Sequence, residues 1–268
     1  MIDFTLKLYK KLIISLLEQN YKIFTFEEFC KGERAEKFII LRHDVDEMAD
    51  NALEMAKIEK ALGVRATYNF RTVKQSNKPD IIRAIAALGH EIGYHYEDLA
   101  FADGDFEHAI STFRQNLEYF RQFYLVKTVC MHGSSTSKYD NRDLWKYHSI
   151  EDEGLLGEPY LSINFDNIYY ISDTGYRWDG FKTAVRDVVK SGFSNVYHHT
   201  NDIILAVKNN EFPAQAMILA HTLWSNNFFK WTGIWSREFF RNNIKKISKK
   251  NKFINKIYSY FVKLYWER

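Results

Sequence analysis

The sequence predicts a single-domain α/β barrel built from parallel strands. Strand-like and helix-like segments alternate along most of the 268 residues, as they do in parallel α/β folds. Residues 38–41 (Phe-Ile-Ile-Leu) are apolar without interruption, which is typical of a strand buried on both faces. Polar residues follow several of the strands, and the carboxyl ends of barrel strands line the ligand site. About seven strands are expected, which favours a barrel over an open sheet.

Each element follows from apolar spacing and from the residues that end it. Helical spacing opens the chain, and Gly63 and Gly89 each end a later helical segment, as glycine commonly does. Short β-branched or aromatic runs mark the strands. The expected helices are residues 4–18, 51–62, 79–88, 106–123 and 201–207. The expected strands are 38–41, 66–70, 91–95, 126–131, 167–172, 195–197 and 216–220.

Composition is consistent with one domain in a reducing compartment. The chain is 46% hydrophobic, with three prolines, twelve glycines and no linker or repeat. We expect a helical extension (1–35), a barrel (36–236) and a basic tail (237–268). Cys30 and Cys130 are too few to build a disulfide framework, so we expect a cytoplasmic protein. Lysines interrupt the first apolar stretch, which excludes a signal peptide or membrane span there.

The carboxyl-terminal tail is strongly basic. From Arg237 onwards ten Lys and Arg stand against two acids, a net charge of +8, whereas the whole chain carries +3. Apolar residues recur at helical spacing over 254–265. Such a helix either packs on the body with its lysines in solvent or lies peripherally on an anionic membrane surface. Nucleic-acid binding is not expected, because a basic tail without a recognition motif does not establish it.

Two carboxylates follow the first buried strand. Asp44 and Asp46 are two residues apart, so in an extended chain their side chains leave the same face. Two adjacent carboxylates repel one another unless a cation or shared proton compensates them. The pair therefore indicates a metal site, with one carboxylate as ligand and the other as base.

Further candidate residues stand at the ends of other strands. They are His95, His132, Asp173 and His221. A lone histidine is commonly a structural residue, but this repeated placement at one rim favours a shared site. His198 and His199 lack such spacing and are expected to be ligands, substrate contacts or surface residues.

Three motifs together resemble the polysaccharide deacetylases, carbohydrate esterase family 4 with the NodB homology domain. They are Leu-Arg-His-Asp-Val-Asp (41–46), Gly-His-Glu-Ile-Gly-Tyr-His (89–95) and Ile-Leu-Ala-His (218–221). The sequences of residues 66–68 and 132–133 resemble those of an uncharacterised branch of this family that is associated with surface-polysaccharide biosynthesis. The resemblance covers residues 36–232 and implies a distorted (β/α)7 barrel that removes N- or O-linked acetyl groups from sugars.

The resemblance also implies roles for individual residues. Asp44 matches the general base and Asp46 a metal ligand. His95 matches the first histidine of a His-x-x-x-His metal motif. His221 matches the general acid, and Asp173 the acid that orients it. The implied cofactor is one divalent ion, zinc first, with manganese or another first-row metal as the alternative.

Two departures from the family pattern affect the site. The second histidine of His-x-x-x-His is replaced by Leu99, which cannot bind a metal. We expect His132 as the third ligand, with Asp98 or Glu97 as alternatives. A carboxylate there would shift preference from zinc towards manganese. The family's arginine-containing motif is also absent where His132 and Gly133 stand.

The expected partner is a carbohydrate, lipid-linked if the basic tail contacts a membrane. We expect Trp224 (from His-x-x-Trp), Tyr139 and Arg142 to contact this substrate. Two other functions remain open: a non-catalytic glycan-binding protein on a decayed barrel, and hydrolysis of another non-peptide C–N bond on the same scaffold.

Overall fold

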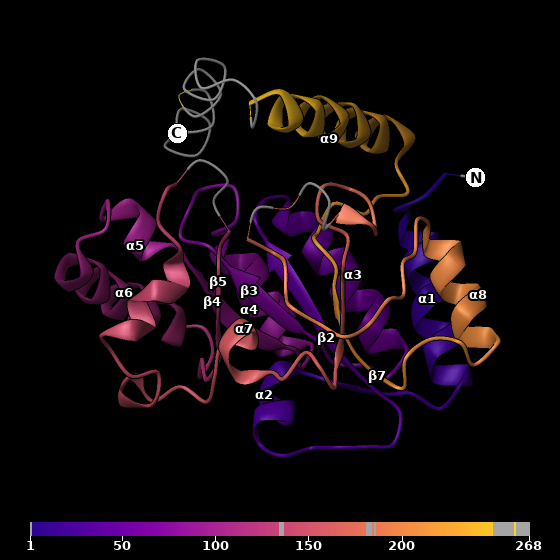
Figure 1. The fold of residues 1–268 in the computed structure, drawn as a ribbon, viewed down its shortest axis with the longest axis horizontal. Coiled ribbons are helices and arrows are strands. Elements are labelled where there is room, and N and C mark those ends of the chain that lie inside the picture. Colours follow the sequence, from indigo (N-terminus) through magenta and orange to yellow (C-terminus); the bar gives the residue numbers. More distant parts are fainter. Residues whose placement is uncertain (1, 134–136, 181–183, 185, 249–259, 261–268) are drawn as a thin grey trace.

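A computed structural model describes residues 2–133, 137–180, 184, 186–248 and 260. Its centre is a parallel seven-stranded sheet with the order β5-β4-β3-β2-β7-β6, in which β1 also pairs with β2 (Figure 1). The strands are β1 (Lys22–Phe24), β2 (Phe38–Val45), β3 (Thr67–Phe70), β4 (Glu91–Tyr96), β5 (Val129–Met131), β6 (Tyr169–Ser172) and β7 (Gln215–Leu219). Within the described residues no pairing joins β5 to β6, so the barrel is open on that side. The α/β barrel expected from the sequence is confirmed in this form.

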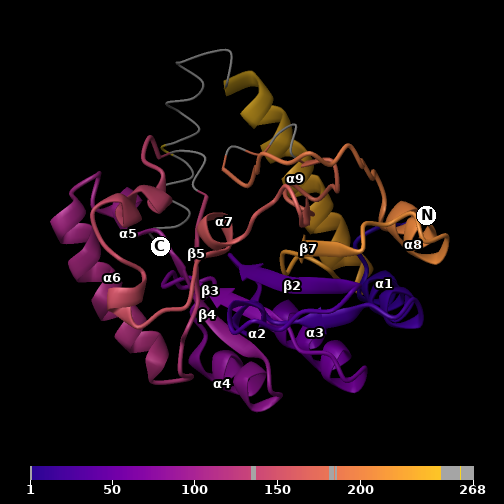
Figure 2. The same cartoon turned by 60° about the horizontal axis from the view of Figure 1, so that its bottom comes forward.

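Helices connect the strands, and most of them cover the outside of the sheet (Figure 2). They are α1 (Leu6–Glu18), α2 (Phe26–Cys30), α3 (Ala49–Ala61), α4 (Pro79–Ala87), α5 (Asp98–Phe101), α6 (Phe106–Arg121), α7 (Pro159–Ser162), α8 (Thr200–Lys208) and α9 (Phe228–Ser248). Two 3-10 segments, Asn141–Lys146 and Glu151–Glu153, follow β5. The five helices expected from apolar spacing are present with bounds shifted by two residues or fewer.

The alternation of side chains along β2 separates the two sides of the sheet. Ile39 and Leu41 belong to the large core under the outer helices, whereas Phe38 and Ile40 belong to a second apolar cluster. The second cluster includes residues of α2 and of the segment after α7, and it fills one end of the barrel interior. Because side chains alternate, Arg42 and Asp44 share the inner face with Ile40. The interior is therefore apolar at one end and polar towards the carboxyl ends of the strands.

The first 35 residues, expected from the sequence as a helical extension of the barrel, also contribute a strand to the sheet. β1 pairs in parallel with the start of β2, from Lys22 opposite Phe38 to Phe24 opposite Ile40. β3 continues along the same edge of β2 from Arg42 onwards. α1 lies beside α8 (Figure 1) and buries its apolar stripe in the large core. This segment therefore completes the sheet.

One expected strand is wrong. Residues 195–197 form no strand, and the seventh member of the sheet is β1. The tyrosine in this segment, Tyr197, packs against Tyr169 and Phe212 from outside the sheet, so its burial reflects packing on the large core rather than strand pairing.

The chain ends, as far as the structure describes it continuously, in the long helix α9. Figure 1 shows α9 lying across one end of the body. No helix of the described residues is both long and apolar enough to span a membrane. The expected helix over 254–265 lies outside the described residues apart from Tyr260.

Candidate metal and catalytic site

Asp44 lies at the inner face of β2, where its neighbours on the next two strands hold it. Asn69 is its register partner on β3, and the Asn69 Nδ2 group donates to Asp44 Oδ1 at 2.9 Å. Gly93 is the register partner of Asn69 on β4. A Cβ at position 93 would clash with the Asn69 side-chain oxygen. The second glycine of the Gly-His-Glu-Ile-Gly motif therefore leaves room for the amide that orients Asp44.

A buried arginine two residues earlier on the same face of β2 compensates the charge of Asp44. The fully buried Arg42 Nη2 lies 3.2 Å from Asp44 Oδ2 and donates to the Tyr160 hydroxyl at 3.0 Å. Burial alone would raise the pKa of Asp44, but the Arg42 guanidinium, followed by two histidines, lowers it below its ordinary value. Asp44 is therefore ionised at neutral pH and available to accept a proton.

Asp46, His95 and His132 converge at the mouth of the barrel. The His95 Nε2 atom lies 3.4 Å from Asp46 Oδ1, and the His132 Nε2 atom lies 3.6 Å from the same oxygen. The three potential ligand atoms lie within 4.8 Å of one another. The side chains come from the ends of β2, β4 and β5. In the sheet β5 lies beside β4, and β3 separates β4 from β2. Parallel strands thus deliver all three to one point.

The second nitrogen of each imidazole is already engaged. His95 Nδ1 lies 2.9 Å from the Cys130 carbonyl oxygen, and His132 Nδ1 lies 2.9 Å from Glu97 Oε2. Both partners are acceptors, so each ring carries a proton on Nδ1, and in the neutral form of each ring the Nε2 lone pair faces Asp46. Arg71 donates to both oxygens of Glu97 at 2.8 Å and fixes it. The pKa of Glu97 is about 2, because Arg71 and His132 outweigh the effect of burial.

The donor set fits a divalent cation. Asp46 Oδ1 is buried without a hydrogen-bond partner, although it faces two imidazole nitrogens that present lone pairs when neutral. Such an orphaned carboxylate oxygen among nitrogen acceptors is unfavourable without a cation. Burial alone would raise the pKa of Asp46, yet the charge of His132 and the hydrogen bond and charge of His95, both in their protonated forms, hold it well below its ordinary value, as a bound cation would in their place. Asp46 is therefore an anion, as a metal ligand must be.

A second grouping of potential ligands, Asp44, His95 and Cys130, lies deeper. Burial raises the pKa of the Cys130 thiol well above its ordinary value, so the thiol keeps its proton. Because a metal binds the thiolate, this grouping is a poorer site than the one at Asp46.

His221 lies on the opposite side of the mouth. Its Nε2 atom is 4.0 Å from Asp46 Oδ2, and its Nδ1 atom is 2.7 Å from Asp173 Oδ1. Burial alone would lower the pKa of His221, but the hydrogen bond and charge of Asp173, with Asp46 and Asp44, raise it to about 10. The ring is therefore a cation at neutral pH that can donate from Nε2. The structure brings Asp173 and His221 together across β6 and β7, as the sequence predicted.

Trp224 requires a correction. The sequence indicated a substrate contact, but its ring is fully buried against Phe4 and Tyr9. Its indole N–H donates to Asp173 Oδ2 at 2.9 Å. Trp224 therefore holds the carboxylate that orients His221, and it offers no surface to a sugar.

The remaining candidates for the third ligand face elsewhere. Asp98 accepts hydrogen bonds from Tyr94 and Asn116, and Glu97 is engaged with Arg71 and His132. Leu99, in the position of the missing histidine, is buried in the large core. Of the three candidates considered from the sequence, His132 is the one whose free ring nitrogen reaches Asp46.

The other predicted contacts lie apart from this cluster. Arg142 pairs with Asp140 and stacks over the ring of Tyr160, whose hydroxyl accepts a hydrogen bond from Arg42. The Tyr139 ring is half-buried beside Gly104. His198 and His199 lie on the surface near Asp179 and Asp3 respectively and join no ligand cluster of the described residues. Substrate contact by Tyr139 and Arg142 stays a prediction.

Sequence reasoning missed the residues that orient the site. Asn69 has a local signal, because it stands one residue before the end of β3, the strand that pairs with β2 beside Asp44. Glu97 is expected from the sequence as an alternative ligand, but neither its role as the partner of His132 nor that of Arg71 has a local signal, because their ion pair joins the ends of β3 and β4. The Cys130 carbonyl oxygen belongs to the backbone, so no pattern of side chains in the sequence predicts its contact with His95.

Comparison with known proteins gives structural matches alone. No protein-family model and no curated protein sequence matches the chain. A CE4 family pseudoenzyme from Bacillus anthracis is 15% identical, with a TM-score of 0.42, covering 79% of this chain and 62% of that one. A peptidoglycan deacetylase from Bdellovibrio bacteriovorus is 18% identical, with a TM-score of 0.42, covering 79% and 51%.

A further match is a family 4 carbohydrate esterase from Streptomyces lividans in complex with acetate. It is 16% identical, with a TM-score of 0.41, and the match covers 76% of this chain and 88% of that one. These proteins belong to the family that the motifs resemble. The chain spans less than two thirds of the pseudoenzyme and about half of the Bdellovibrio protein. At these TM-scores the likeness adds nothing to the argument from the site.

Proposed function

We propose that the protein is a metal-dependent hydrolase that removes acetyl groups from a sugar or glycan precursor. The observation that carries the proposal is the buried Asp46 oxygen without a donor, placed between the free nitrogens of His95 and His132. Asp44 and His221 flank this point and provide a base and an acid. The acetylated sugar as substrate rests on the motif resemblance.

Asp46, His95 and His132 would hold the ion. Two nitrogen donors and one carboxylate, with an open side, suit catalytic zinc, and manganese is the alternative. When bound, the ion polarises the acetyl carbonyl and stabilises the charge that develops on its oxygen.

Asp44 and His221 transfer the protons of the reaction. Asp44 is an anion whose Oδ1 is fixed by Asn69, so it accepts the proton of the attacking water at a fixed position. His221 enters the reaction protonated and gives its Nε2 proton to the departing nitrogen or oxygen. Asp173 keeps the ring oriented through Nδ1 and stabilises its charge. The division between base and acid follows from opposite environments, since Arg42 lowers the pKa of Asp44 and Asp173 raises that of His221.

The test is acetate release from a panel of N-acetylated and O-acetylated sugars, with protein loaded in turn with zinc, manganese or cobalt. Asp44→Asn is expected to keep the metal and lose activity by a factor of at least about 100. Asp46→Asn is expected to lose both. The matched control is Asp143→Asn, a carboxylate of the 3-10 segment after β5 whose partner is a surface lysine.

Two outcomes would replace the proposal. Sugar binding that persists in chelator, with no acetate release by any loaded form, would indicate a glycan-binding protein. Turnover of a cyclic amide or another non-peptide C–N bond in a metabolite screen, with no acetate released, would indicate a hydrolase of a different substrate class.

A further inference from the structure

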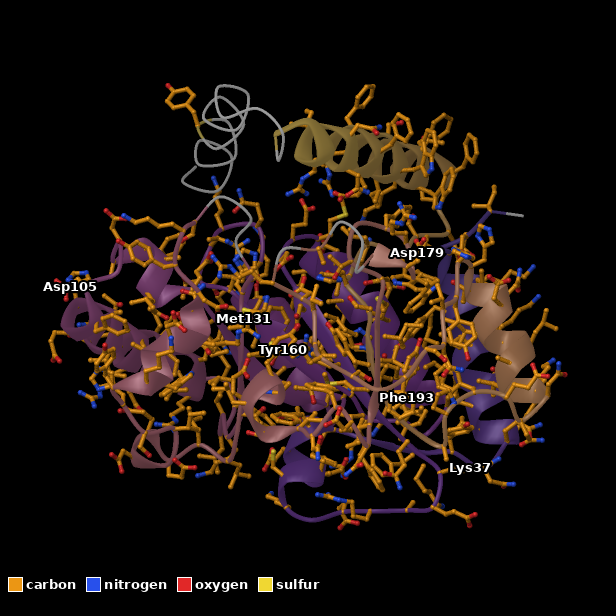
Figure 3. All side chains as sticks on the ribbon, viewed as in Figure 1. Lys37, Asp105, Met131, Tyr160, Asp179 and Phe193 are labelled. Atoms are coloured by element: carbon orange, nitrogen blue, oxygen red, sulfur yellow. The ribbon has the colours of Figure 1, made fainter. Side chains whose placement is uncertain are left out.

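The outer face of α9 is an exposed aromatic surface. Five rings project from it, and Phe229 is 84% exposed. The five residues are Phe228, Phe229, Trp235, Phe239 and Phe240, and Ile244 extends the set by one turn. Figure 3 shows α9 lying across one end of the body, with Asp179 labelled on the side of the body that faces the helix. Elsewhere in the described residues, Phe101 is the one exposed Phe or Trp. A gathering of this kind on one helix indicates an interaction surface.

The charged residues of α9 up to Arg241 point the other way. Arg237 donates to both oxygens of Glu47, and Lys230 donates to Asn51. Ile234 is buried between them. Thr232, Ser236 and Asn243 complete the outer face. Over residues 228–244 the helix thus directs its charges to the body and leaves an uncharged aromatic face outward.

The inner face of α9 rests beside the catalytic mouth. Glu47, which pairs with Arg237, follows the metal-site residue Asp46. The backbone oxygen of Glu47 also accepts from Thr222, the neighbour of His221. The outer aromatic face is therefore about one helix diameter, about 10 Å, from the rim of the site.

We infer that α9 docks the protein onto the surface of an anionic lipid bilayer, with the mouth of the barrel next to that surface. Aromatic side chains favour the interface between lipid and water. The sequence over 245–256 contains six lysines and no acid, which complements anionic headgroups. A second copy of the chain would bring the same positive charge to the interface, which disfavours it as the occupant.

Docking at a membrane indicates the substrate class of the proposed hydrolase, and this conclusion rests on the proposed function. A glycan precursor carried on a lipid anchor holds its sugar within a short distance of the membrane surface. A mouth about one helix diameter from that surface suits such a substrate.

Vesicle co-sedimentation of the full chain tests the docking and requires no catalysis, so it can fail independently of the proposed function. Wild-type protein is expected to bind vesicles of phosphatidylglycerol and phosphatidylcholine, to bind pure phosphatidylcholine more weakly, and to release in high salt. The variant with Phe229→Ser and Phe240→Ser is expected to lose binding by about tenfold or more. The matched control carries Phe101→Ser and Tyr147→Ser, two exposed rings on the body, and is expected to bind as wild type.

Three results would overturn the inference. The first is wild-type protein that does not bind anionic vesicles. The second is equal loss in the α9 variant and the matched control. The third is a dimer in sedimentation velocity that the α9 variant dissociates while vesicle binding is unchanged, which would assign the face to a second copy. Brominated lipids provide an orientation check: they should quench Trp fluorescence of the wild type, and Trp235→Phe should remove part of that quenching.

Discussion

Replacing Glu97 by Gln tests how the protein compensates for the leucine at position 99. Glu97 accepts from His132 Nδ1 at 2.9 Å and is itself held by two hydrogen bonds from Arg71. Glutamine keeps an oxygen for the imidazole but removes the charge that makes the ring a stronger ligand. Loss of such a partner lowers metal affinity by about 10–100-fold, which is about 1.4–2.7 kcal/mol.

The assay is competition for zinc against a chromogenic chelator at constant pH. Stability is measured separately by urea unfolding, because the buried Arg71 loses its carboxylate and the free energy of unfolding is expected to fall by about 3–5 kcal/mol. Glu91→Gln is the matched control: Glu91 is a buried carboxyl at the start of β4, the strand that precedes Glu97, and it accepts from Thr67 and Thr128, remote from the ligands. Zinc affinity that is unchanged in Glu97→Gln, or lost equally in the control, would refute the role assigned to His132 and Glu97.

Four further predictions follow from the same geometry. Asp173→Asn removes the charge that holds the pKa of His221 at about 10, so the alkaline limb of kcat should move to lower pH while zinc content is kept; an unmoved limb contradicts the acid role. Gly93→Ala should displace Asn69 from Asp44 and lower kcat by at least about tenfold with metal retained, and full activity would show that Asn69 does not orient the base. Leu99→His, combined with His132→Ala, should not restore zinc binding, because position 99 lies in the large core; recovered affinity would disprove this placement. Burial raises the pKa of Asp98 from 3.8 to about 6, so the folded state binds the proton of this carboxyl more tightly than the unfolded state does. The stability that this proton provides is complete below about pH 4 and is lost as the pH rises to 6, so Asp98→Asn should gain up to about 3 kcal/mol relative to wild type across that range. Urea unfolding at each pH measures the difference, and a difference that does not change with pH would count against the assignment.

The sequence predicted the fold where the signals are local. Apolar spacing and terminal glycines marked α3 and α4, and the uninterrupted run at 38–41 marked β2. β1 was missed because it is three residues long and belongs to the sheet through its pairing with β2. The sequence predicts a strand at 195–197 because a valine beside a tyrosine that is buried in a loop has the same local pattern as a short strand.

The candidate site was predictable where residues end strands. Asp44, Asp46, His95, His132 and His221 meet because parallel strands share one rim. The residues that orient them were not predictable, since each acts across strands: Asn69 on Asp44, Glu97 on His132. Trp224 was misassigned because a motif position does not reveal burial.

The most direct test of the account is the anomalous difference map of a zinc-soaked crystal, collected at the zinc edge. The account predicts one strong peak within about 2–2.3 Å of Asp46 Oδ1, His95 Nε2 and His132 Nε2, the distances of zinc to carboxylate and imidazole ligands. A map with no peak at these three atoms, from protein in which the side chains are ordered, would contradict it.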